Sequence, residues 1–278
     1  MYIYHLSGTL ENLDPITPDL WDAGCQGLVE SSGTVLAYFA EPLELPFGGT
    51  WQPADDTDWL AAYRASLQPV RIGNVTITPP WLAEQTAPDS LQIILEPGLA
   101  FGTGQHETTY MAIAALQRQP LAQQKVLDVG AGTGILAIVA AKLGAIVLGV
   151  DNDSSTVVVA QENAVQNNVS ADFRAGLLED MLSHAPFMVV VANLFAELHA
   201  LLMPQYKLAL DPRGVLILTG ILAGTEQADA DEQITWDTAS GRENLVLTAL
   251  TEHGLRVARR EQKGDWVLLE CVNMPMKR

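Results

Sequence analysis

The sequence predicts an α/β protein with a doubly wound, mostly parallel β-sheet, preceded by a small α+β domain. From residue 110 onward, short apolar runs alternate with segments of helical periodicity. This alternation is typical of parallel strands joined by helical crossovers. The last two apolar runs, 255–262 and 265–272, are separated only by Lys263 and Gly264. Such a short connection predicts a hairpin, so one terminal strand should run antiparallel to the others.

The small α+β domain is expected over residues 1–55. Residues 1–10 alternate between apolar and polar side chains, which indicates a strand. Residues 27–40 predict two more short strands around a turn that contains Gly33. Between these pieces, residues 14–24 predict a helix with a proline in its first turn and a glycine at its end.

A connection between the two domains is predicted over residues 46–70. Prolines and glycines interrupt regular structure over 46–53. Apolar side chains then recur at helical spacing, namely Trp59, Leu60, Tyr63 and Leu67. We therefore predict a linker helix over 56–70 and a larger domain over 71–278. The stretch 46–53 would act as a hinge, because a few residues suffice to absorb backbone rotation.

The strands and helices of the larger domain are predicted from apolar runs of strand length and from apolar residues at helical spacing. Strand-like pieces occur within 75–85 and 90–98. Further strands are predicted at 125–130, 146–151, 172–176, 187–193 and 214–221, and helices at 111–119, 134–145, 154–168 and 194–210. The acidic, polar stretch 226–242 is expected to be a surface insertion.

Composition and charge narrow the classes of partner. The 278 residues carry 33 acidic against 15 basic side chains, a formal net charge of −18. This charge disfavours non-specific nucleic-acid binding, which needs a cationic surface, and it suits a basic partner. Cys25 and Cys271 are the only cysteines, so neither a disulfide framework nor a zinc site is predicted. Without a signal sequence or a long apolar run, the expectation is a cytoplasmic protein that does not contact membranes.

A glycine-rich turn between a strand and a helix carries the sharpest signal. In "VLDVGAGTG", the glycines at 130, 132 and 134 follow an apolar strand, and glycine allows a ligand to approach the backbone closely. The dinucleotide fingerprint is G-x-G-x-x-G, but here Ile135 follows G-x-G-x-G. Asp128 precedes Gly130 by two residues and would repel a pyrophosphate. An acid at this place is characteristic of S-adenosylmethionine sites, so Asp128, Gly130 and Gly132 are predicted to bind that cofactor.

Two polar residues stand at the ends of neighbouring strands. Asp151 ends the strand after the glycine turn, where a carboxylate can accept hydrogen bonds from ribose hydroxyls. The alternative role is a helix N-cap, which Asp153 fits better. Asn193 ends an apolar strand at the edge where open α/β sheets bind ligands, and is predicted to lie at the position of group transfer. Its alternative role is also an N-cap.

These segments resemble the bacterial ribosomal protein L11 methyltransferases (PrmA). The similar stretches are "EPGLAFGTGQHETT" at 96–109, "VLDVGAGTGILAIVAAKLGA" at 126–145, "GVDND" at 149–153 and "VVANLFAELHALL" at 190–202. The resemblance covers essentially the whole chain. The departures are "NLF" where many members have Asn-Ile-Leu, and the acidic insertion. The resemblance implies a Rossmann-like, seven-stranded class I methyltransferase domain with S-adenosylmethionine as cofactor and no metal.

The resemblance also implies roles for individual residues. Thr109, Gly130, Asp151 and Asn193 would contact the cofactor, and Asn193 would also position the reacting groups. The loop residues Phe101, Gly102, Thr103 and Gly104 would cover it. His106 could act as a base or simply be a loop histidine bonded to backbone, and it is not assigned a catalytic role. Glu179 could reach the adenine amine, although a surface carboxylate is the simpler expectation.

The implied reaction is methyl transfer to lysine side chains and the N-terminal amine of ribosomal protein L11. The first domain would then recognise the substrate, and a monomer is expected. Three other functions stay open at this point. One is lysine methylation of a different protein. Another is NAD-dependent oxidoreduction, against which Ile135 and Asp128 count. The third is a non-catalytic binding module on the same scaffold, although such a scaffold has no need of Thr109, Asp151 and Asn193 together.

Overall fold

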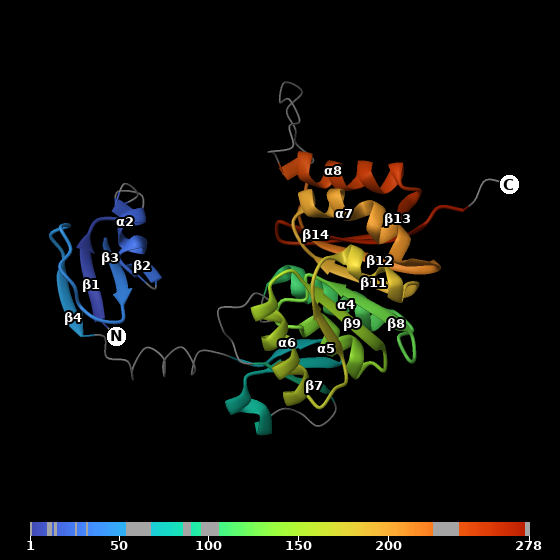
Figure 1. The fold of residues 1–278 in the computed structure, drawn as a ribbon, viewed down its shortest axis with the longest axis horizontal. Helices are drawn as coiled ribbons and strands as arrows, with labels where there is room; N and C mark the ends of the chain where they lie inside the picture. Colours follow the sequence, from blue (N-terminus) through green and yellow to red (C-terminus); the bar gives the residue numbers. More distant parts are fainter. Residues whose placement is uncertain are drawn as a thin grey trace. The chain divides into compact units, whose positions relative to one another are not determined.

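The computed structural model describes residues 2–9, 13, 16–25, 27–31, 33–53, 68–85, 90–95, 106–224 and 239–275 (Figure 1). The chain divides into two compact units, Met1–Leu67 and Gln68–Arg278. Most of the predicted linker helix over 56–70 lies outside the described residues. Its last residue, Val70, already belongs to a strand of the second unit.

The first unit contains a four-stranded antiparallel sheet in the order β2-β3-β1-β4. Its elements are β1 (Tyr2–Ser7), α2 (Thr17–Asp22), β2 (Gly27–Ser31), β3 (Thr34–Phe39) and β4 (Thr50–Pro53). Alternate residues of β1 and β3, including Tyr4, Leu6 and Phe39, are buried together with Leu20 of α2. The strands and the helix predicted between residues 1 and 40 are therefore confirmed.

The stretch predicted as a hinge turned out to contain a strand. β4 pairs antiparallel with β1, and the backbone N–H of Gly49 donates to the Tyr4 hydroxyl at 2.8 Å. The Trp51 ring packs against Tyr4 and Phe39, with centroid distances of 4.8 and 5.2 Å. A hinge over residues 50–53 is thus wrong, because aromatic burial outweighs the breaker residues. Pro53 is tolerated because it ends an edge strand, where its missing N–H leaves no ladder bond unmade.

The second unit is built on a seven-stranded sheet in the order β10-β9-β8-β11-β12-β14-β13. The strands are β8 (Lys125–Val129), β9 (Ile146–Asp151), β10 (Asp172–Ala175), β11 (Phe187–Asn193), β12 (Leu210–Leu222), β13 (Leu255–Lys263) and β14 (Trp266–Asn273). β14 runs antiparallel to both of its neighbours, and the other neighbouring pairs are parallel. The predicted doubly wound sheet with an antiparallel terminal hairpin is confirmed.

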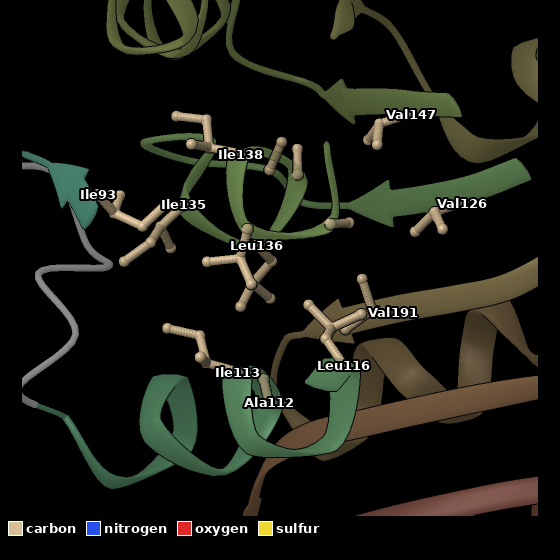
Figure 2. Packing of buried hydrophobic residues seen from close by; sticks show 14 of the residues in the cluster. Ile93, Ala112, Ile113, Leu116, Val126, Ile135, Leu136, Ile138, Val147 and Val191 are labelled. Atoms are coloured by element: carbon tan, nitrogen blue, oxygen red, sulfur yellow. The ribbon is translucent and has the colours of Figure 1, made fainter. Parts of the chain in front are cut away.

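Helices cover both faces of this sheet (Figure 1). One face carries α4 (Glu107–Arg118), α5 (Ile135–Lys142) and α6 (Ser154–Gln166), and the other carries α7 (Ala196–Ala209), α8 (Ala239–Glu252) and the short helix η3 (Leu178–His184). Figure 2 shows part of the first layer, where Leu116 of α4 lies beside Val191 of β11 and Ile135 of α5 lies beside Ile93; Val126 of β8 belongs to the same cluster. Adjacent strand residues such as Leu127 and Val190 join the second layer, as the alternation of side chains along a strand requires.

The acidic insertion predicted over 226–242 lies mostly outside the described residues. The part that is described, 239–242, forms the first turn of α8, so the insertion ends earlier than predicted. A hydrogen bond connects the residues on either side of this stretch: the Glu243 carboxylate accepts from the backbone N–H of Gly224 at 2.8 Å. Glu243 also accepts from Arg260 of β13 at 2.6 Å.

A small three-stranded sheet precedes α4. It comprises β5 (Val70–Ile72), β6 (Val75–Thr78) and β7 (Leu91–Ile94), with the 3-10 helix η2 (Pro80–Gln85) between the last two. The Asn167 side chain at the end of α6 binds both backbone groups of Ile94, each at 2.7 Å. The strand-like pieces predicted here are confirmed. None of the helices among the described residues is long and apolar enough to cross a bilayer.

Candidate active site at the carboxyl edge of the sheet

The glycine turn connects β8 to α5 at the point where the strand order reverses, between β8 and β11. Open α/β sheets bind ligands in the crevice at such a switch point. Gly130, Gly132 and Gly134 all adopt positive φ, which side chains disfavour. The N–H groups of Gly130 and Ala131 donate to the Val150 carbonyl at 2.9 and 3.0 Å. A side chain on Gly130 would be strained by the positive φ of 73°, and its Cβ would also lie 2.6 Å from a methyl group of Leu194, so glycine is favoured at this turn.

Asp151 ends β9 and braces the glycine turn. One carboxylate oxygen accepts from the Gly132 N–H at 2.9 Å, and the other from the Asp153 N–H at 3.0 Å. Asp153, not Asp151, is the N-cap of α6, because its carboxylate accepts from the Ser155 N–H at 2.8 Å. Each oxygen of a carboxylate has two acceptor sites, so Asp151 retains capacity for a ligand's hydroxyl groups.

Asp128 lies beneath the glycine turn rather than at the surface of the cavity. Its side chain is buried, and one oxygen accepts from the Ala137 N–H in α5 at 3.0 Å. Burial raises the pKa of Asp128 to about 7, the hydrogen bond from Ala137 opposes this rise, and the nearby charge of Asp151 adds to it. The structure thus gives Asp128 a role in holding α5 against β8, and Asp128 is not among the residues that line the cavity described below.

The start of α4 brings three polar side chains to the same edge. His106 is the N-cap of α4, and its Nδ1 atom accepts from the Thr108 N–H at 3.3 Å. Nδ1 also lies 2.7 Å from the Thr108 hydroxyl, which in turn accepts from the Asn193 amide nitrogen at 3.2 Å. Thr108 was not singled out from the sequence, although it is the link between His106 and Asn193. The second expectation for His106, a histidine bonded to backbone, matches this geometry.

Thr109 presents an unusual hydroxyl group to this edge. The side chain is 1% exposed, and its Oγ1 atom has no hydrogen-bond partner among the described residues. An unpaired buried hydroxyl is unfavourable, and Thr109 lines the cavity described below, so this hydroxyl is a candidate partner for a polar ligand.

Asn193 ends β11 but does not cap the following helix. The N-cap of α7 is Phe195, and it makes no side-chain capping bond. The alternative assignment of Asn193 as an N-cap is therefore wrong. The backbone next to it is close-packed, since a Cβ on Gly220 of β12 would lie 2.3 Å from the Leu194 carbonyl oxygen.

These residues surround a cavity of about 480 Å³, within the usual range for small-molecule sites. The sequence-predicted residues that line it are Thr109, Gly130, Gly132, Asp151 and Asn193, and His106 lines it as well. Residues that sequence reasoning missed include Ile135, Leu194, Phe195, Leu198, Gly220 and Trp266. Trp266 packs edge-on against His106 with a centroid distance of 5.1 Å.

Some of the predicted site residues do not line this cavity, and others lie outside the described residues. Asp128 and Glu179 are not among its lining residues. Glu179 is exposed on η3, as expected for a surface carboxylate. The predicted cover, Phe101 to Gly104, lies outside the described residues.

The strand order, the glycine turn and the carboxylate at the end of β9 together define a class I methyltransferase, the class that uses S-adenosylmethionine. Comparisons with known proteins then identify the particular family. A family model described as "Ribosomal protein L11 methyltransferase (PrmA)" matches residues 41–273. The chain belongs to the ribosomal protein L11 methyltransferase family, as its sequence motifs predicted.

Individual relatives agree with this assignment. The chain is 44% identical to the ribosomal protein L11 methyltransferase of Thermus thermophilus over 269 residues, covering 97% of this chain and 98% of the relative. It is also 44% identical to the enzyme of the same name from Deinococcus radiodurans, with the same coverage. The crystal structure of ribosomal protein L11 methylase from Lactobacillus delbrueckii subsp. bulgaricus matches with a TM-score of 0.62 and 29% identity, covering 75% of this chain and all of that one. These relatives exclude the oxidoreductase alternative.

Proposed function

We propose that this chain transfers methyl groups from S-adenosylmethionine to lysine side chains and the N-terminal amine of ribosomal protein L11. The observation that carries the proposal is the convergence of Thr109, Gly130, Asp151 and Asn193 on one cavity at the switch point of the sheet. The match to L11 methyltransferases over nearly the whole chain supports the choice of substrate.

The residues around the cavity suit this cofactor. Asp151 would accept hydrogen bonds from the ribose hydroxyls, and the unpartnered Thr109 hydroxyl would gain a polar partner. Gly130 and Gly132 have no side chain, so a ligand can approach their backbone closely. When bound, S-adenosylmethionine supplies a methyl group on a sulfonium, which is a good leaving group.

The apolar part of the cavity is expected to lower the pKa of the substrate amine. A lysine amine with a pKa of ~10.4 is mostly protonated at neutral pH and cannot attack. Leu194, Phe195 and Leu198 line the cavity, so an amine that packs against them would exchange part of its bound water for apolar contacts. Desolvation lowers the pKa of an amine because it disfavours the charged form. The chain therefore needs no strong dedicated base, and His106 is not assigned that role.

Asn193 is suited to orient the amine. Its amide nitrogen donates to Thr108, which leaves its amide oxygen to accept an N–H of the substrate. Gly220 keeps space beside this oxygen, because a Cβ there would lie 3.1 Å from it. Orientation of this kind can supply several kcal/mol of rate acceleration, up to roughly 7 to 11 at the favourable limit.

The first unit, Met1–Leu67, is proposed to recognise the protein substrate. The described residues that line the cavity all have numbers of 106 or higher, so substrate recognition is assigned to a different part of the chain from the cavity. The net charge of −18 would help to gather a basic protein by long-range attraction. We further propose that the enzyme acts as a cytoplasmic monomer and does not bind nucleic acid directly.

The direct test is to incubate the protein with radiolabelled S-adenosylmethionine and a mixture of purified ribosomal proteins. Label should accumulate in L11, and mass spectrometry should place it on lysine and N-terminal amines. Asp151→Ala, in which cofactor binding should be weakened, serves as the control with reduced labelling. Labelling of another protein in preference to L11 would favour the alternative of a related lysine methyltransferase.

A further inference from the structure

A histidine that the proposed reaction does not use lies directly behind the cavity wall. His199 belongs to α7 and is completely buried. Its Nε2 atom lies 2.9 Å from the Thr219 carbonyl oxygen, and its Nδ1 atom lies 3.3 Å from the Tyr206 hydroxyl. Both ring nitrogens therefore have partners, one on β12 and one further along α7.

These partners define the protonation state of the ring. Burial lowers the pKa of His199 to about 4, against the opposing effect of hydrogen bonds to Thr219 and Leu194, so the ring is neutral at physiological pH. A carbonyl oxygen can only accept, so Nε2 carries the proton. Nδ1 must then accept from Tyr206, whose pKa is raised by burial and whose hydroxyl keeps its proton.

The Thr219 carbonyl oxygen accepts hydrogen bonds from more than one residue near the cavity. It also accepts from the Leu194 N–H at 3.0 Å. Thr219 stands opposite Asn193 in the register of β11 and β12, and its hydroxyl donates to the Val267 carbonyl of β14 at 3.2 Å. One carbonyl group thus joins β11, β12 and α7 at the edge where the cofactor cavity lies.

The turn from β11 into α7 needs such support. It carries three consecutive cavity residues, Asn193, Leu194 and Phe195. Its N-cap residue makes no side-chain capping bond, so the helix start lacks the usual stabilisation. The His199 backbone N–H donates to the Phe195 carbonyl at 3.1 Å, while its ring reaches the Thr219 carbonyl. His199 therefore ties the first turn of α7 to the end of β12.

We propose that His199 is a positioning residue that fixes the Asn193–Phe195 turn for methyl transfer, acting through the Thr219 carbonyl group, with Tyr206 selecting its tautomer. The expected effect on methyl transfer rests on the proposed function. The expected protonation of the His199 ring and its effect on the Asn193–Phe195 turn do not. A histidine that merely fills the core would affect stability without affecting turnover.

The decisive variants are His199→Phe, which keeps the ring but removes the donor, and His199→Gln, whose amide nitrogen can replace Nε2. His199→Phe should lower kcat about 10- to 100-fold, as expected for a misplaced reacting group, with little change in KM for the protein substrate. His199→Gln should restore most of the lost turnover. Met203→Ala is the matched control, because Met203 is equally buried on α7. Met203 is not among the residues that line the cavity, and no hydrogen bond between the described residues joins it to Thr219. It should lower Tm and leave kcat per folded molecule unchanged.

A double-mutant cycle tests whether the effect passes through Asn193. In the Asn193→Ala background, His199→Phe should change kcat by less than about twofold, since residues that act as one unit are not additive. Equal effects of His199→Phe in both backgrounds would contradict the proposed route. An unchanged kcat for His199→Phe, with a Tm loss like that of Met203→Ala, would reduce His199 to core packing.

Two further readouts do not depend on turnover. Nitrogen NMR of the labelled protein should show the His199 ring protonated at Nε2, with no titration between pH 5 and 8, and Tyr206→Phe should disturb this signal. Calorimetry should show weaker S-adenosylmethionine binding for His199→Phe than for Met203→Ala. If the wild-type protein fails to methylate L11 but both readouts behave as expected, the substrate assignment fails and the positioning role stands. A ring protonated at Nδ1, or equal cofactor affinity in the two variants, overturns the positioning role.

Discussion

Asp151, at the end of β9, accepts a hydrogen bond from the backbone N–H of Gly132 at 2.9 Å. This bond joins the ends of two neighbouring strands through the glycine turn. The same carboxylate would receive the ribose hydroxyls of the cofactor. Asp151 is thus expected to shape the turn and to bind the ligand at the same time.

Asp151→Ala should weaken S-adenosylmethionine binding by about 1.5 to 3 kcal/mol, the usual value of hydrogen bonds to a charged group. Calorimetry measures this directly. Asp151→Asn keeps one acceptor oxygen and should fall between the wild type and the alanine variant. Unchanged affinity in the alanine variant would remove Asp151 from the cofactor site.

Thr109→Val tests the unpartnered hydroxyl. Valine has nearly the same shape and leaves no polar atom to bury, so Tm should stay the same or rise. Cofactor affinity and methyl transfer should nevertheless fall, because the ligand loses a partner. Thr108→Val is the matched comparison, and it should lower Tm because it breaks the bonds to His106 and Asn193. A Thr109→Val enzyme with full activity would show that this hydroxyl has no role.

Asn193→Ala should reduce methyl transfer far more than it lowers the melting temperature. Loss of a helix cap typically costs about 1 kcal/mol of stability, but Phe195 and not Asn193 occupies the N-cap of α7. Measuring kcat and Tm on the same preparation separates the two effects. Activity that falls only in proportion to the folded fraction would mean that Asn193 is structural.

Asp128→Asn should flatten the dependence of stability on pH. The pKa of Asp128 is raised from 3.8 to about 7 in the folded protein. Between those pH values the folded protein keeps the Asp128 proton, while the unfolded protein has released it. The contribution of this proton to the free energy of unfolding is therefore fully present at low pH and is lost as pH rises toward 7. A pKa that differs by one between the folded and unfolded states corresponds to about 1.4 kcal/mol of stability. Asparagine mimics the neutral acid and still accepts from Ala137.

Denaturant unfolding at several pH values checks this expectation. Relative to the wild type, the Asp128→Asn protein should gain stability as pH increases from about 4 to 7, and the gain should level off above that range. Parallel stability profiles for the two proteins would show that Asp128 is ionised throughout.

A fragment that begins at Gln68 should still bind S-adenosylmethionine, because the described residues that line the cavity belong to the second unit. It should lose methylation of intact L11 if the first unit recognises the substrate. Capture of L11 by the full-length protein should weaken as salt is added, since screening reduces attraction between opposite net charges. Equal methylation rates for fragment and full chain would contradict the recognition role.

Much of this site could be predicted because its residues immediately follow apolar strands. Asp151 and Asn193 each end a run of buried residues, and the carboxyl ends of parallel strands meet at one edge. Trp266 and Gly220 could not be found in this way. They reach the cavity because β12 and β14 are neighbours in the sheet, and the order of strands is not encoded in local periodicity.

The direction of its side chain explains why Asp128 does not line the cavity. Along β8, Val126 faces the layer of α4 and α5, and alternate residues share a face. Asp128 therefore points under α5, although it stands close to the glycine turn in sequence. The strand β4 was missed for a different reason. Pro46, Gly48 and Gly49 before it and Pro53 at its end indicate a loop, and only the tertiary contacts of Trp51 favour the strand.

The position of β14 has a consequence for how the enzyme is made. The ribosome produces β12 and β13 before β14, yet β14 lies between them in the finished sheet. Until residues 266–273 emerge, β12 has an unpaired edge, which is a template for association with other chains. Trp266, which forms part of the cavity wall, arrives with the same strand. The cavity is therefore completed by the strand that is translated after the other six described strands of its sheet, and a nascent chain that stops short of it has an open sheet and an incomplete cavity.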